Sequence, residues 1–148
     1  MFSNFFKIII PKTKIIFIVE DNELYAKSLN TFLKIRFPKI KEIKNFRIGE
    51  MCLMEMHRNP RIVIIDYFLN SKYEEANNGL EIIKSIKILK PKTDIIVLSI
   101  QQNFNIIAEA VKQYGCSYVH KDQWAFNKVE HLIKENFNHP TSGFEPRA

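Results

Sequence analysis

The chain has 148 residues, of which 46% are hydrophobic and 26% charged, and its formal net charge is +6. This length and composition fit one globular domain and exclude a wholly disordered or collagen-like chain. No apolar run approaches the roughly 20 residues of a membrane-spanning helix, and two cysteines are too few for a disulfide framework. We therefore expect a cytoplasmic protein with no membrane association.

Strand-like and helix-like segments alternate along the chain. Strands are predicted where β-branched apolar residues run almost without interruption, and helices where apolar residues recur every three or four positions. In chain order we predict a strand over 14–20, a helix over 22–37, an edge strand over 40–46, a helix over 49–58, a strand over 61–67, a loop over 70–78, a helix over 79–90, a strand over 93–100, a helix over 103–114, a strand over 117–120 and a helix over 123–136.

These five β–α units predict the fold class and the domain organisation. Strands that are apolar on both faces are typical of a parallel sheet covered by helices on each side, so we expect a doubly wound α/β fold. The domain is predicted over 14–138, between an N-terminal extension over 1–13 and a flexible C-terminal tail over 139–148.

Six of the chain's basic residues lie between Lys34 and Arg47, where Glu42 is the sole acid. Such a run is compatible with nucleic-acid contact, but no stacking aromatic pattern or groove-reading helix accompanies it. We interpret it as a solvated helix end and edge strand, and expect no direct nucleic-acid partner.

Polar residues follow four of the five predicted strands. Glu20 and Asp21 end the first strand, Asp66 the third, Ser99 the fourth and Lys121 the fifth. The carboxyl ends of parallel strands meet at one edge of the sheet, which is where doubly wound folds bind ligands. We therefore expect three carboxylates, a hydroxyl and an ammonium to converge there.

This set of groups favours phosphoryl chemistry. Clustered carboxylates repel one another unless a cation joins them, and oxygen ligands of this kind suit Mg²⁺. An aspartate can attack phosphorus to form an aspartyl phosphate, while a lysine and a hydroxyl hold the phosphoryl oxygens. The sequence thus predicts a site that accepts a phosphoryl group.

Five segments of the chain resemble the receiver domain of two-component response regulators, in particular stand-alone receivers like those of chemotaxis. The resemblance covers about residues 14–137. The segments are IIFIVEDN (15–22), VIIDYFL (63–69), NGLEII (78–83), IIVLSI (95–100) and SYVHKD (117–122). It implies a flavodoxin-like sheet of five parallel strands in the order 2-1-3-4-5.

The resemblance also implies a role for each site residue. Asp66 corresponds to the phosphoacceptor, and Lys121 and Ser99 to the residues that hold the phosphoryl group. Glu20, Asp21, Asp66 and the backbone carbonyl of Phe68 correspond to the Mg²⁺ ligands. Ser99 and Tyr118 correspond to the switch pair, in which the aromatic ring moves inward when the hydroxyl residue shifts.

The implied partners and activity follow from the same resemblance. The phosphoryl donor would be a histidine kinase or a histidine phosphotransfer protein, and an unidentified downstream protein would bind the switched face. The chain would act as a monomer or as a homodimer linked to phosphorylation. It would not be an enzyme in the usual sense, because it catalyses only its own phosphorylation and dephosphorylation.

Three positions depart from the family pattern. The loop over 71–78 is several residues longer than usual, Ile100 follows Ser99 where a small residue is common, and Asp122 replaces a frequent proline, which argues against a cis peptide there. The bulk of Phe68 and Ile100 leads to the hypothesis that they restrict the water that hydrolyses phospho-Asp66.

Two alternatives remain open. Ile100 and the altered loop are the grounds for a receiver-like binding module that works without phosphorylation, whereas the complete acidic set argues against it. An aspartyl phosphatase is a third possibility, but such enzymes place a second aspartate two residues after the nucleophile, where this chain has Phe68.

Overall fold

The computed structural model describes residues 14–69, 78–100 and 104–138. The predicted extension and tail, and all of the long loop except Asn78, lie outside these residues. The described part contains a five-stranded, all-parallel sheet in the order β2-β1-β3-β4-β5. The strands are β1 (Ile15–Val19), β2 (Glu42–Phe46), β3 (Ile62–Asp66), β4 (Asp94–Ser99) and β5 (Ser117–His120). The predicted doubly wound α/β fold is confirmed.

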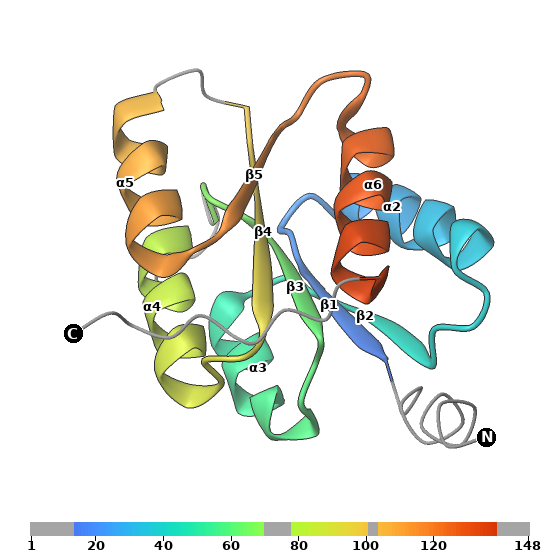
Figure 1. The fold of residues 1–148 in the computed structure, drawn as a ribbon, viewed down its shortest axis with the longest axis horizontal. Coiled ribbons are helices and arrows are strands. Elements are labelled where there is room, and N and C mark those ends of the chain that lie inside the picture. Colours follow the sequence, from blue (N-terminus) through green and yellow to red (C-terminus); the bar gives the residue numbers. More distant parts are fainter. Residues whose placement is uncertain (1–13, 70–77, 101–103, 139–148) are drawn as a thin grey trace.

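Helices cover both faces of this sheet (Figure 1). On one face lie α3 (Gly49–Met54), α4 (Gly79–Leu89) and α5 (Phe104–Tyr114). On the other lie α2 (Glu23–Arg36) and α6 (Ala125–Asn138). The described chain contains no helix long and apolar enough to cross a membrane.

Alternation along the central strands divides the core in two. In β1, Phe17 and Val19 pack into the cluster under α3, α4 and α5, whereas Ile16 and Ile18 pack into the cluster under α2 and α6. All four are 0% exposed. Side chains of a strand point alternately to its two faces, so a strand buried on both sides must be apolar throughout.

Several predicted bounds shift because local capping determines where helices begin and end. The predicted helix over 49–58 is α3 followed by a separate 3₁₀ turn over Met56–Arg58, and the chain then leaves through Asn59 at φ 56°. Asparagine tolerates this left-handed backbone, and Pro60 disfavours a helical residue before it. The last helix begins at Ala125 rather than 123, after the Asp122 carboxylate accepts a hydrogen bond from the Trp124 N–H.

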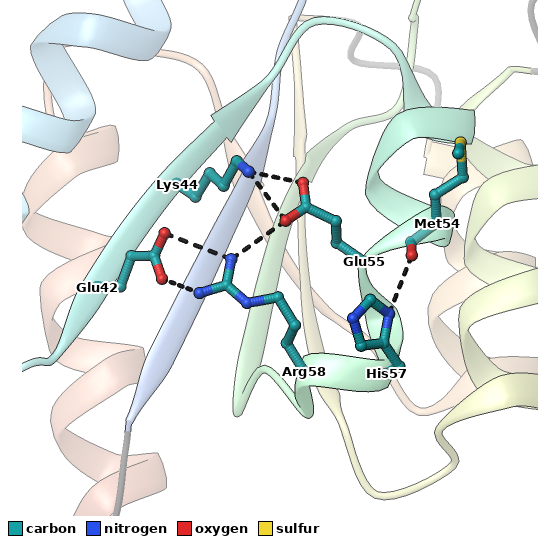
Figure 2. Close-up of polar contacts among 6 residues, drawn as sticks. All are labelled: Glu42, Lys44, Met54, Glu55, His57 and Arg58. Carbon is teal, nitrogen blue, oxygen red and sulfur yellow. Dashed lines mark hydrogen bonds and ion pairs between the residues drawn. The ribbon is translucent and has the colours of Figure 1, made fainter.

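The edge strand β2 is tied to the turn that follows α3 by an ion-pair network (Figure 2). The Lys44 ammonium donates to both Glu55 carboxylate oxygens, at 2.9 and 2.7 Å. Arg58 bridges Glu55 and Glu42. β2 is an edge strand of the sheet, as predicted for residues 40–46. The pair with Glu55 neutralises the charge of Lys44, which belongs to the basic run between Lys34 and Arg47.

Candidate functional site

The carboxyl edge of the sheet gathers the residues predicted to form the site. Asp66 and Ser99 are the last residues of β3 and β4, while Glu20 and Lys121 directly follow β1 and β5. Backbone pairing continues past the strand ends, because Glu20 N–H donates to the Phe46 carbonyl at 3.0 Å and Lys121 N–H to the Ser99 carbonyl at 2.9 Å. These bonds hold the backbone of the site in register with the sheet.

Three carboxylates converge at this edge. Glu20, Asp21 and Asp66 each offer an oxygen, and these oxygens all lie within 4.8 Å of one another. Glu20 is 1% and Asp66 7% exposed, and Asp21 is half-buried. The donor set is all oxygen and partly accessible, which fits the requirements of a hard divalent cation such as Mg²⁺.

Lys121 is the cation that joins two of these acids, Glu20 and Asp66. Its ammonium donates to both Glu20 carboxylate oxygens and to Asp66 Oδ2, each at 3.0 Å. Its side chain is 8% exposed. The other Asp66 oxygen, Oδ1, accepts the Phe68 N–H at 3.0 Å. Asp66 is therefore held at both oxygens and oriented within the site.

Burial and neighbouring charges shift the pKa values of Glu20 and Lys121. Burial, followed by the negative charge of Asp66, raises the pKa of Glu20 to about 8. Burial alone would lower the pKa of Lys121, but the carboxylates of Asp66 and Glu20 outweigh it and leave that pKa raised. Lys121 therefore stays an ammonium, and Glu20 holds its proton to a higher pH than an ordinary glutamate does.

The predicted switch residues occupy neighbouring strands. Ser99 is fully buried at the end of β4. Tyr118 lies in β5 opposite Val97, is half-buried and packs against the core cluster beneath α3, α4 and α5. Burial, with a smaller effect of Asp122, raises the Tyr118 pKa. The switch role of the pair stays a prediction.

The two bulky residues proposed to restrict water are both substantially exposed. Phe68 is 44% and Ile100 69% exposed, and the Phe68 ring contacts Tyr67 edge-on with 5.1 Å between ring centroids. Most of the Ile100 side chain thus faces outward, and its effect on hydrolysis remains untested. No peptide bond among the described residues is cis, as expected from Asp122 in place of proline.

Sequence reasoning missed two contacts of the Lys121 ammonium. The first is its bidentate pairing with Glu20, and the second is the Tyr25 ring, whose centroid lies 4.5 Å from Nζ. Tyr25, Leu29, Phe32 and Leu33 have the spacing of one helix face in the sequence, which places Tyr25 on the apolar face of its helix. Tyr25 lies in the first turn of α2, four residues after Asp21, and is therefore close to the carboxyl edge of the sheet. This spacing was the signal from which a contact with the site could have been predicted.

The fold and this pocket define an all-parallel α/β protein with an acidic, lysine-bridged site at the carboxyl edge of its sheet. The model of the response regulator receiver domain family matches residues 16–134. The chain therefore belongs to the response regulator receiver domain family, which confirms the resemblance seen in the sequence. No curated protein sequence matched the chain.

Solved structures share this fold at low sequence identity. The RcsB response regulator of Salmonella typhimurium, described for its conformational dynamism in DNA interaction, matches at TM-score 0.73 and 18% identity over 91% of this chain. This chain spans 64% of that protein. The isolated RcsB receiver domain from Salmonella enterica, studied with the phosphomimetic BeF₃⁻, matches at TM-score 0.70 and 18% identity, over 84% of this chain and 90% of that one.

A third similar structure is the receiver domain of a DNA-binding response regulator from Colwellia psychrerythraea. It matches at TM-score 0.72 and 21% identity, over 85% of this chain and 99% of that one. At these identities the likeness establishes the common fold and leaves residue roles to the chemistry of the site.

Proposed function

We propose that this receiver domain accepts a phosphoryl group from a phosphohistidine onto Asp66, and that the donor is a histidine kinase or a histidine phosphotransfer protein. The observation that carries the proposal is the held Asp66 carboxylate, paired with Lys121 at 3.0 Å and grouped with Glu20 and Asp21 at the carboxyl edge. In the transfer, an Asp66 oxygen attacks phosphorus as the phosphorus–nitrogen bond breaks. The bonding pair returns to the imidazole nitrogen of the donor, and an acyl phosphate forms.

The residues already in place have separate tasks in this step. The Phe68 N–H, bound to Asp66 Oδ1, orients the nucleophile. Lys121 sits where its ammonium can offset the charge of the incoming phosphoryl oxygens. Glu20, which shares that ammonium, keeps Lys121 beside Asp66 before the donor arrives.

Mg²⁺ is part of the proposal because the acidic cluster fits it. Once Glu20 has released its proton, three carboxylates and one lysine leave the site a net negative charge that a divalent cation would balance. Glu20, Asp21, Asp66 and the Phe68 carbonyl would hold the ion. When bound, the ion would supply positive charge to the phosphoryl oxygens.

Phosphorylation is proposed to switch a protein-binding face. The phosphoryl group adds about −1.5 to −2 charge units at Asp66. Ser99 and Lys121 would then gain an acceptor. Tyr118, which packs against the core cluster beneath α3, α4 and α5, would shift in response and change the surface formed by α5, β5 and α6. A downstream protein would bind that face of a monomer or of a phosphorylation-linked homodimer. We propose no direct nucleic-acid contact and a cytoplasmic location, and the chain's only catalysis would act on its own phosphorylation and dephosphorylation.

Phosphate uptake tests this function directly. Wild-type protein, Asp66→Asn and Asp94→Asn are incubated with Mg²⁺ and either ³²P-labelled acetyl phosphate or labelled histidine kinases. Asp94→Asn is the matched control, because Asp94 begins β4 at the opposite edge, where its carboxylate accepts a hydrogen bond from Asn136. We expect label in the wild type and Asp94→Asn and none in Asp66→Asn.

Two results would contradict the proposal. Label that persists in Asp66→Asn identifies another acceptor. Absence of label in the wild type with every donor favours the phosphorylation-independent binding module.

A further inference from the structure

Tyr25 contacts the ammonium of Lys121 from a side that no carboxylate occupies. That ammonium contacts three carboxylate oxygens, two from Glu20 and one from Asp66, each at 3.0 Å. The Tyr25 ring centroid lies 4.5 Å from the same nitrogen, within the roughly 6 Å range of a cation–π contact. The ring therefore attracts the ammonium in addition to its carboxylate partners.

The position of this ring is fixed by both neighbouring helices. Tyr25 lies in the first turn of α2, where its backbone N–H donates to the Asn22 side chain at 3.0 Å. The Tyr25 ring packs edge-on against Phe126 of α6, with 5.4 Å between centroids, and Phe32 packs against Phe126 at 5.4 Å. Tyr25, Phe126 and Phe32 thus form an aromatic cluster that includes the ring in contact with the ammonium.

We infer that Tyr25 is a positioning residue for Lys121, holding its ammonium beside Asp66 through attraction to the ring and not through a further carboxylate. The inference rests on the proposed phosphoacceptor function. In the transfer, the ammonium must exchange carboxylate oxygens for phosphoryl oxygens. Attraction to a ring face has little directional demand, so the ammonium can slide across the ring during this exchange, whereas a fixed hydrogen-bond acceptor would keep one donor occupied.

The ring also covers the lysine. The Lys121 side chain is 8% exposed although it lies at the edge of the sheet. A leucine at position 25 would fill part of the space but would provide no π face. A phenylalanine would keep the face and remove the Tyr25 hydroxyl, which is buried and has no hydrogen-bond partner among the described residues. The phenylalanine variant thus separates the ring from the hydroxyl.

Two measurements test the role of Tyr25. The first is the rate of phosphorylation by acetyl phosphate with Mg²⁺ in the wild type, Tyr25→Phe, Tyr25→Leu and Phe32→Leu. Phe32→Leu is the matched control, because it removes a ring from the same aromatic cluster, and the Phe32 ring contacts Phe126 whereas Lys121 contacts Tyr25. We expect Tyr25→Leu to react about fivefold more slowly, which corresponds to about 1 kcal/mol, and the other two to stay within about twofold of the wild type.

The second measurement needs no substitution. A ring face over the ammonium shifts the NMR signals of the Lys121 ε-methylene protons upfield in the resting wild-type protein, and Tyr25→Phe preserves this shift. Unshifted protons in the wild type would overturn the inference even if Tyr25→Leu fails to fold, and so would equal phosphorylation rates in Tyr25→Leu and Tyr25→Phe. A wild type that never takes up phosphate overturns the proposed function together with this inference, whereas the first two results overturn this inference alone.

Discussion

Glu20 makes the stability of this protein depend on pH, and Glu20→Gln should remove that dependence. The pKa of this carboxyl rises from 4.5 in its ordinary state to about 8 in the folded protein, through burial first and the charge of Asp66 second. Between these values the folded protein holds a proton that the unfolded chain releases. Its contribution to stability is therefore full below about pH 4.5 and is lost as the pH rises through 8.

The magnitude follows from the size of the shift. Each pH unit in this window changes the free energy of unfolding by up to about 1.36 kcal/mol, so the interval from pH 5 to pH 8 gives at most about 4 kcal/mol. Partial titration at both ends reduces this to about 3 kcal/mol. The lowered pKa values of Glu55 and Asp122 act at more acidic pH, and the raised pKa of Lys121 acts at more alkaline pH.

Urea unfolding of the metal-free protein in EDTA, at intervals from pH 5 to pH 8, measures this effect. Wild-type stability should fall by about 3 kcal/mol relative to Glu20→Gln across the window. Any change in the contacts with Lys121 that does not depend on pH offsets the variant's curve by a constant, so the difference in slope is diagnostic. Glu81→Gln is the control and should parallel the wild type, because Glu81 is at an exposed position of α4 and pairs with a lysine, Lys84. Parallel curves for wild type and Glu20→Gln would refute the reasoning.

Three other substitutions test the scaffold and the metal site. Gly79→Ala would place a Cβ 2.6 Å from the Tyr67 Cα, so we expect urea unfolding to show a loss of about 2 kcal/mol; an unchanged midpoint contradicts this. Glu55→Gln should cost up to about 1 kcal/mol at low salt and less at about 1 M, because partly exposed ion pairs are screened; a cost independent of salt argues against the network. Mg²⁺ should raise the melting temperature of the wild type but not of Asp21→Asn, and equal shifts would count against the proposed metal ligands.

The fold was largely predictable because its strands carry an unambiguous pattern. Ile15–Val19 is buried at every position, and such a run occurs where helices cover both faces of a sheet. The residues at which helices begin and end were less predictable, because each helix end depends on one capping residue. The break at Glu55, whose φ of −108° and ψ of 7° interrupt the predicted helix, has no signal in its neighbours that we can identify.

The composition of the site was predictable, but its internal pairing was not. Strand ends at one edge bring Glu20, Asp66 and Lys121 together in any fold of this topology. The choice of carboxylate oxygens that the Lys121 ammonium contacts depends on side-chain rotamers and on the packing of α2 against α6. The contact between Tyr25 and Lys121 arises from that packing, which the spacing of apolar residues along α2 does not specify.

The identity of the phosphorylated residue tests the central claim most directly. Borohydride reduction converts an aspartyl phosphate to homoserine, and peptide mass spectrometry then locates it in protein treated with acetyl phosphate and Mg²⁺. The proposed function predicts homoserine at position 66, between Ile65 and Tyr67, and at no other position. Homoserine at Asp21 or elsewhere, or none in protein that carries phosphate, would contradict it.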